Sequence, residues 1–130
     1  MNDINLTHAF AIGLGATIGA WLRWGLGVFF NSVIPHLPLG TLIANLAGGL
    51  MMGVALGVFA TSNLDNQTLR LLITTGFLGG LTTFSAFSGE SLVLMLKHEY
   101  VWMMIHTLSH VLGALLMASI GYYFVQLIRA

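Results

Sequence analysis

The sequence has no cysteine and very little charge. Without cysteine, its 130 residues can form neither a disulfide framework nor a thiolate metal site. Charged residues make up only 6% of the chain, whereas about 25% is usual in a soluble domain. The formal net charge is zero, so the basic face that nucleic-acid binding requires is missing, and we expect no nucleic-acid partner.

Apolar residues take the place of the missing charge. They make up 57% of the chain, and a chain this short cannot bury so much apolar surface in a core of its own. We therefore expect the protein to be surrounded by membrane lipid. No nucleophile–base pair or carboxylate pair is evident, which argues against an enzyme.

A bilayer-spanning helix needs about 20 mostly apolar residues, and four segments qualify. They cover residues 8–29, 39–60, 69–96 and 100–128. The first segment lacks the basic start and the cleavage site of a signal peptide, so we expect it to be retained. The predicted fold class is an all-α membrane protein with four transmembrane helices, in which residues 1–130 form a single domain.

The third segment contains residues that interrupt a helix. Gly79 and Gly80 are adjacent, and each lowers helix stability. In lipid, a non-helical backbone is tolerated only where it is buried in protein or lines a cavity. The pattern therefore predicts that the third helix is broken near its middle, and that the freed carbonyls of the break could bind a structural Na⁺. Four hydroxyl residues follow the glycines: Thr82, Thr83, Ser85 and Ser88.

The basic residues favour neither orientation in the membrane. Arg70 and Arg129 belong to one face, and Lys97 and Arg23 belong to the other. Because each face has two basic residues, the positive-inside rule predicts no preferred orientation. Either other features set a weak bias, or the chain inserts both ways and forms an antiparallel homodimer. Glycine stripes support close helix contacts but do not say whether these lie within or between chains.

Four polar residues are predicted to lie at one depth. Arg23, Glu90, Asn45 and His106 each stand six residues from the same end of their segments, which is about 9 Å along a helix. Arg23 could snorkel to the surface while Glu90 ends a helix. Alternatively, the layer is a wet vestibule in which Arg23 attracts anions. Asn45 could bond a neighbouring helix or donate to an anion.

His106 and His110 are four residues apart and therefore share one helix face. Such a pair could bind a metal ion or haem, but the other histidines fall in or near connectors, and we expect no further ligand from another span. A polar strip beside a water-filled passage is the preferred interpretation.

Phe84 and Phe87 could simply pack against other side chains. An aromatic ring has a positive edge, however, so rings that present edges to a pore could stabilise an anion without trapping it. The neighbouring hydroxyls of Thr83, Ser85 and Ser88 would suit a small, strongly hydrated anion.

Three motifs together resemble the Fluc (CrcB-type) fluoride channel family. They are GATIGAWLRW at residues 15–24, GTLIAN at residues 40–45 and GGLTTFSAFS at residues 79–88. The similarity covers nearly the whole chain and includes its length and number of spans. It implies an antiparallel, dual-topology homodimer with two separate fluoride pores.

The resemblance also implies roles for individual residues. Phe84 and Phe87 are similar to the phenylalanine-box residues of the family's pores. Asn45 is similar to the pore-lining amide, and Arg23 to the vestibule arginine, which Glu90 would accompany.

Backbone and polar positions follow from the same resemblance. Gly79 and Thr82 fall where the family's broken helix offers carbonyls to a central Na⁺, the one cofactor we expect. Polar pore positions are implied for Ser85, Ser88 and His110. The chain departs from the family at Ala86, where many members carry Thr, and along the fourth span, where His106, His110 and Ala114 replace a more hydroxyl-rich track.

The expected function is passive export of fluoride across the bacterial plasma membrane, which would lower cytoplasmic fluoride. Two alternatives stay open. A dual-topology small multidrug transporter would need a carboxylate in the membrane, for which Glu90 is the only candidate. A metal- or haem-binding membrane subunit would use His106 and His110.

Overall fold

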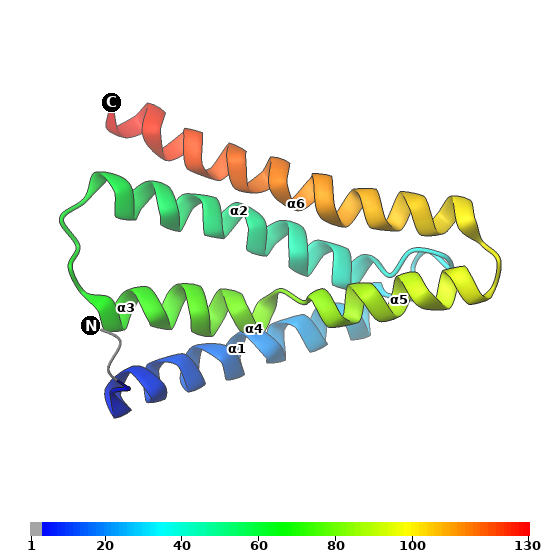
Figure 1. Cartoon of the computed structure of the whole chain (residues 1–130), viewed down its shortest axis with the longest axis horizontal. Coiled ribbons are helices and arrows are strands. Elements are labelled where there is room, and N and C mark those ends of the chain that lie inside the picture. The colour runs from blue at the N-terminus through cyan, green and yellow to red at the C-terminus, as the bar shows by residue number, and fades with distance from the viewer. Residues whose placement is uncertain (1–3) are drawn as a thin grey trace.

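The computed structural model describes residues 4–130, and this part of the chain is helical apart from short connectors (Figure 1). Three pieces, α3, η1 and α4, continue one another, and with α5 they make up a long third helix. The elements in chain order are α1 (Leu6–Phe30), α2 (Leu39–Thr61), α3 (Gln67–Leu71), the π-helical η1 (Leu72–Leu78), α4 (Gly79–Leu81), α5 (Phe84–Leu96) and α6 (Tyr100–Arg129).

Four helical stretches are long and apolar enough to cross a membrane: Leu6–Phe30, Leu39–Thr61, Gln67–Leu96 and Tyr100–Arg129. Their ends lie within two residues of the predicted spans. One end of the bundle carries the C-terminus and the connector between α2 and α3, and the opposite end carries the other two connectors (Figure 1). The prediction of an all-α protein with four membrane helices is confirmed. The antiparallel homodimer stays a prediction.

Glycines let the helices approach closely. A Cβ atom added to Gly49 in α2 would lie 2.7 Å from the Ala114 carbonyl oxygen of α6. A Cβ on Gly15 in α1 would lie 2.6 Å from the Phe77 amide nitrogen of η1. These glycine stripes therefore make contacts within one chain, which the sequence left undecided. In lipid, such small-residue contacts supply much of the attraction between helices.

The buried core is small, and the outer surface is apolar. Ala44, Leu78 and Leu81 form the fully enclosed cluster. Large apolar side chains such as Trp21 and Leu115 are about two-thirds exposed, at 66% and 65%. A surface of this kind requires lipid or another protein to cover it.

The predicted break in the third helix is present, but the glycine pair is not where the backbone leaves the helix. Gly79 and Gly80 lie in the helical turn of α4, where Gly80 packs against the backbone of Ala16. The backbone becomes extended at Thr82 (φ −83°, ψ 156°) and Thr83 (φ −150°, ψ 123°). Gly80 thus provides close packing, and the hydroxyl residues make the break.

Candidate functional site

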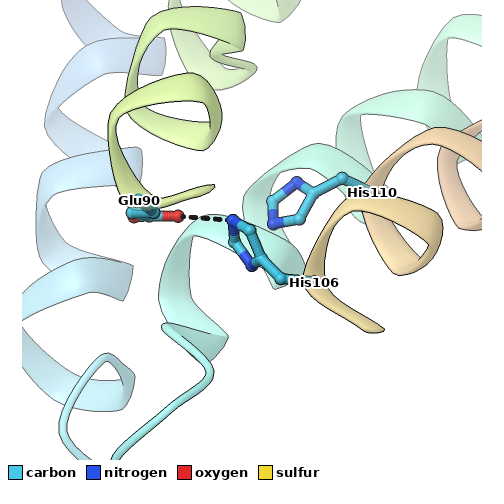
Figure 2. Close-up of side chains that lie close together, drawn as sticks. All are labelled: Glu90, His106 and His110. Carbon is cyan, nitrogen blue, oxygen red and sulfur yellow. Dashed lines mark ion pairs between the residues drawn. The ribbon is translucent and has the colours of Figure 1, made fainter. Parts of the chain in front are cut away.

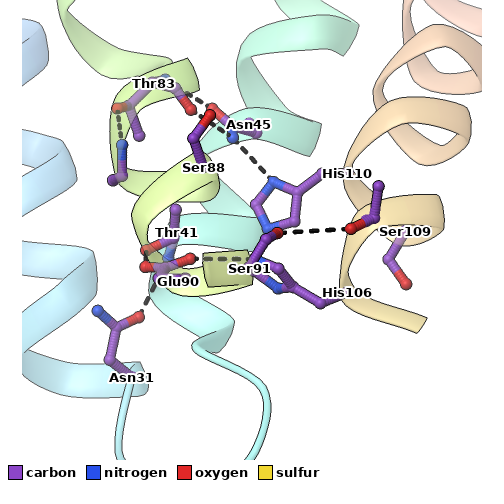
Figure 3. A network of polar contacts seen from close by, with 12 residues as sticks. Asn31, Thr41, Asn45, Thr83, Ser88, Glu90, Ser91, His106, Ser109 and His110 are labelled. Atoms are coloured by element: carbon purple, nitrogen blue, oxygen red, sulfur yellow. Dashed lines mark hydrogen bonds and ion pairs between the residues drawn. The ribbon is translucent and has the colours of Figure 1, made fainter. Parts of the chain in front are cut away.

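Asn45 holds the broken part of the third helix. Its Oδ1 accepts a hydrogen bond of 2.7 Å from the Thr83 amide, and its Nδ2 donates one of 3.0 Å to the Thr83 carbonyl oxygen. The same Nδ2 lies 2.9 Å from Nδ1 of His110. One side chain of α2 therefore connects the break to α6 (Figure 3).

These bonds free two backbone carbonyls. In a continuous helix, the Thr83 amide would donate to Gly79 and the Ala86 amide to Thr82. Here the Thr83 amide donates to Asn45, and the Ala86 amide donates to Thr83 Oγ1 at 3.1 Å, which caps α5. The carbonyls of Gly79 and Thr82 are hard oxygen ligands of the kind that Na⁺ binds, so the residues fit the predicted ion. Binding of Na⁺ stays a prediction.

The two predicted phenylalanines are close to each other but differ in exposure. Their ring centroids are 5.5 Å apart at an interplanar angle of 63°, an edge-to-face arrangement. Phe87 is 8% exposed and packs on the rings of His106 and His110, at centroid distances of 5.5 and 4.9 Å. Phe84 is 78% exposed and projects from the surface of the chain.

A cavity of about 370 Å³, here called the phenylalanine cavity, lies beside these rings. Polar groups border it only at Asn45, His110 and the two threonines of the break, and no Lys, Arg, Asp or Glu is among the described residues that line it. An anion in this space would meet ring edges and amide or hydroxyl dipoles, but no full counter-charge. The lining residues are Asn45, Gly48, Gly49, Met52, Thr82, Thr83, Phe84, Phe87, His110, Val111 and Ala114.

A second cavity of about 380 Å³, here called the vestibule, lies nearer the 31–38 connector. Arg23 and Glu90 both line it, as expected, and Thr83 borders it as well as the phenylalanine cavity. Arg23 Nε donates a 3.1 Å hydrogen bond to the Gly80 carbonyl oxygen. The predicted polar layer is therefore not one shared space. Arg23 and Glu90 line the vestibule, Asn45 lines the phenylalanine cavity, and His106 lines neither. Thr83 lines both cavities.

Glu90 joins the vestibule to the histidines. Its Oε1 accepts a 2.6 Å hydrogen bond from Thr41 Oγ1, and its Oε2 lies 3.4 Å from His106 Nε2. The expectation that no other span supplies a ligand to the histidine pair is wrong, because ligand atoms of Glu90, His106 and His110 all lie within 4.8 Å of one another. Thr41 was missed, although its position four residues before Asn45 on one helix face was a usable signal.

The remaining predicted hydroxyls have local partners. Ser88 Oγ donates a 2.8 Å hydrogen bond to the Phe84 carbonyl oxygen, and Ser85 Oγ lies 3.3 Å from Thr83 Oγ1. Ser85 is exposed and Ser88 is half-buried. Within one chain, neither lines the phenylalanine cavity.

The chain is similar to proteins of known families. The family model described as CrcB-like protein, Camphor Resistance (CrcB), matches residues 10–122. A protein of Cupriavidus pinatubonensis named fluoride-specific ion channel FluC is 51% identical over 118 residues, which are 91% of this chain and 94% of that protein. A protein of the same name from Aromatoleum aromaticum is 52% identical over 118 residues, 91% and 90% of the two chains. Another, from Pseudomonas putida, is 47% identical over 124 residues, 93% and 98% of the two chains.

Proposed function

This chain belongs to the CrcB-like family, and we propose that it is a fluoride-selective ion channel. Relatives that are about half identical over nearly their whole length are named fluoride-specific ion channels, which supports the proposal. The family and the four apolar helices are those of a multi-pass plasma-membrane protein. The multidrug-transporter and haem-subunit alternatives have no such support, and we set them aside.

The observation that carries the proposal is the pair of adjoining cavities. Arg23 in the vestibule attracts anions from water, and the phenylalanine cavity then offers weak, uncharged contacts. Conduction requires binding that is weak enough for the ion to leave. The positive edges of Phe84 and Phe87 meet this requirement because they attract an anion through a quadrupole and not through a charge. Fluoride would thus pass down its own gradient and leave the cytoplasm.

Asn45 shapes the path chiefly by holding the break. Its Nδ2 has two hydrogens, and two acceptors lie within hydrogen-bond distance, the Thr83 carbonyl oxygen and His110 Nδ1. An ion that accepted a hydrogen bond from this amide would have to replace one of them. We therefore assign to Asn45 a positioning role at the wall of the cavity.

The working assembly we propose is an antiparallel homodimer with two pores. Phe84 is 78% exposed at the edge of the phenylalanine cavity, so a second chain packed there would complete the wall and bury the ring. The balance of basic residues between the two faces permits the inverted copy. Each pore would then contain phenylalanines from both chains.

A Na⁺ ion at the dimer axis completes the proposal. The carbonyls of Gly79 and Thr82 in two inverted copies would supply four oxygens, and the bound ion would neutralise their partial negative charges. The chain's contribution is to keep these carbonyls free, which it does by directing the Thr83 amide to Asn45 and the Ala86 amide to Thr83. Thermal unfolding of the purified protein is expected at a higher temperature in NaCl than in a chloride salt of a large organic cation. Equal unfolding temperatures would contradict this part.

Growth of a bacterium that lacks fluoride export tests the function in cells. Expression of this chain is expected to restore growth in fluoride and to lower cytoplasmic fluoride, whereas Phe87→Ile is expected to do both less well. Phe10→Ile is the control for the same change of side chain, because Phe10 lies far from the break, in the first turns of α1. If the wild-type chain reaches the membrane and growth is not restored, the proposal is wrong.

A further inference from the structure

Three potential metal ligands converge between α5 and α6. His106 and His110 come from one face of α6, and Glu90 comes from α5 (Figure 2). One ligand atom of each lies within 4.8 Å of the other two, and the imidazole centroids are 4.4 Å apart. His106 is 0% exposed and His110 is 4% exposed. The cluster is thus enclosed by protein on the α6 side.

Several polar atoms of this cluster lack hydrogen-bond partners. Among residues 4–130, five buried side-chain nitrogen or oxygen atoms have none, and four of the five belong to this cluster. A buried polar atom without a partner costs free energy, so each such atom in a native protein needs an explanation such as a bound ion. The four are Glu90 Oε2, His106 Nδ1, His106 Nε2 and His110 Nε2.

We propose that Glu90, His106 and His110 form a binding site for a divalent transition-metal ion, with Zn²⁺ as the probe. Imidazole nitrogen and carboxylate oxygen are ligands that Zn²⁺ prefers, and two histidines four residues apart on a helix form a common half of such sites. Tetrahedral Zn²⁺ with bonds of about 2.0–2.2 Å places its ligand atoms about 3.3–3.6 Å apart. The 3.4 Å between Glu90 Oε2 and His106 Nε2 already has this length.

Asn45 controls how readily His110 takes part. Because the Thr83 amide can only donate, the Asn45 atom that it bonds is the oxygen, and Nδ2 is therefore the donor toward His110 Nδ1. Neutral His110 then carries its ring proton on Nε2, the nitrogen that faces the cluster. A metal ion bound at Nε2 requires this proton to move to Nδ1, where it would face the Asn45 Nδ2 donor and the hydrogen bond between them would be lost. Asn45 therefore weakens metal binding without preventing it.

The vestibule gives an ion a way in. Glu90 lines the vestibule and also a third cavity, of about 670 Å³, that reaches Lys97 and Glu99 near the connectors. Arg23 shares the vestibule, but its Nε is bonded to the Gly80 carbonyl and leaves Glu90 Oε2 free. A metal ion can therefore reach the carboxylate from the same end of the bundle.

The site lies where an ion would obstruct fluoride. Phe87 packs on both histidine rings, and His110 lines the phenylalanine cavity, whereas Glu90 lines the vestibule. A metal ion held by all three would sit between the two cavities and would hold any anion that reached it. Block of fluoride passage rests on the proposed function, but metal binding does not.

Titration calorimetry of the purified full-length protein with ZnCl₂ tests the site. We expect one Zn²⁺ to bind per chain. Glu90→Gln and His106→Gln are each expected to bind it at least about tenfold more weakly. The estimate follows from zinc sites in which loss of a residue that only supports a ligand lowers metal affinity about 10- to 100-fold. His36→Gln is the control, because His36 forms a second histidine–glutamate pair with Glu99 near the surface. Absence of binding, or binding lost in His36→Gln and kept in His106→Gln, would overturn the site.

A gain in affinity gives a test that misfolding cannot imitate. In Asn45→Asp, a carboxylate oxygen can accept the proton of His110 Nδ1, which frees Nε2 for the ion and supports the ligand from behind. We expect Zn²⁺ to bind about tenfold more tightly than to the wild type. Unchanged or weaker binding in an Asn45→Asp protein that unfolds at the wild-type temperature would contradict the role given to His110.

Fluoride efflux from vesicles with and without Zn²⁺ tests the block. Zn²⁺ is expected to reduce efflux through the wild type and to have at least about tenfold less effect on His106→Gln. Efflux that is unaffected at saturating Zn²⁺ would refute the block. Calorimetry in detergent measures Zn²⁺ binding without transport. If the protein binds Zn²⁺ but passes no fluoride, the proposed function is wrong and the metal site is still supported.

Discussion

Asn45 and Thr83 are joined by two hydrogen bonds that run in opposite directions. The Thr83 amide donates to Oδ1 at 2.7 Å, and Nδ2 donates to the Thr83 carbonyl oxygen at 3.0 Å. The side chain of α2 thereby replaces the bond that the Thr83 amide loses where the third helix breaks, and adds a second bond to the Thr83 carbonyl. In a membrane, where water cannot satisfy these groups, such a replacement is a condition for having a break at all.

Replacing Asn45 with Ala is therefore expected to destabilise the protein. The Thr83 amide would lose its partner, whereas the Thr83 carbonyl would lose one bond and stay an acceptor in the first turn of α5. One unsatisfied buried group costs about 1–3 kcal/mol, so we expect the free energy of unfolding in detergent to fall by about that amount. Asn63→Ala, in the exposed connector between α2 and α3, is the control and should stay within about 0.5 kcal/mol of the wild type. Equal free energies of unfolding for Asn45→Ala and Asn63→Ala would show that the hydrogen bonds between Asn45 and Thr83 do not stabilise the fold.

Phe87→Ile is expected to slow fluoride efflux while leaving the fold intact. The ring edge is lost but most of the apolar volume remains. Aromatic quadrupole interactions are worth about 0.5–1.5 kcal/mol, which corresponds to a rate about 2- to 13-fold lower. Efflux from vesicles, measured against Phe10→Ile, checks this. Efflux equal to that of the control would show that the ring edge has no role.

Phe84→Ile distinguishes a monomer from the proposed dimer. In a single chain the Phe84 ring is 78% exposed and could contribute little. If a second chain completes the cavity, the same substitution should reduce efflux by a factor similar to that of Phe87→Ile. If Phe87→Ile reduces fluoride efflux and Phe84→Ile does not, the result would argue against a partner chain at this surface.

Gly53→Ala is expected to loosen α2 from α6. A Cβ on Gly53 would lie 2.9 Å from the Tyr122 amide nitrogen and still closer to the Ala118 carbonyl, both of which are backbone atoms that cannot turn aside. Overpacking of this kind costs about 1–3 kcal/mol. Gly13→Ala is the matched control, because no atom lies within 4 Å of its added Cβ. Thermal unfolding should separate the two, and equal unfolding temperatures would contradict the observed packing.

Much of this arrangement could be predicted from the sequence because membrane helices are set by length and composition. The four spans followed from apolar runs, and the break followed from Gly79, Gly80 and the hydroxyl residues after them. The sequence places the break around residues 79–83 but does not say that Thr82 and Thr83 leave the helix. That choice depends on Asn45, which is distant in sequence and becomes a neighbour only after folding.

The metal-ligand cluster shows the same limit. Counting residues from the helix ends placed Glu90 and His106 at one depth, and the structure brings them to 3.4 Å. Depth alone does not say which helix faces are turned toward each other, so Glu90 was not recognised as a third ligand for the histidine pair. The π-helical stretch at Leu72–Leu78, which packs closely against α1, was also not predicted.

A reporter fused to the C-terminus tests the inverted dimer. Arg70 and Arg129 on one face are balanced by Lys97 and Arg23 toward the other, so we expect reporter signal on both sides of the membrane. Extra lysines in the exposed 62–66 connector should shift the signal to one side. Signal on one side only in the unmodified chain would exclude the antiparallel arrangement.

Fluoride efflux from liposomes that contain only the purified protein tests the central claim most directly. Vesicles loaded with fluoride are expected to release it rapidly once the electrical potential is dissipated, and matched vesicles loaded with chloride are expected to release far less. The cause is the uncharged phenylalanine cavity, which suits a small anion held by ring edges and polar dipoles. Absence of fluoride efflux, or equal release of chloride, would contradict the account.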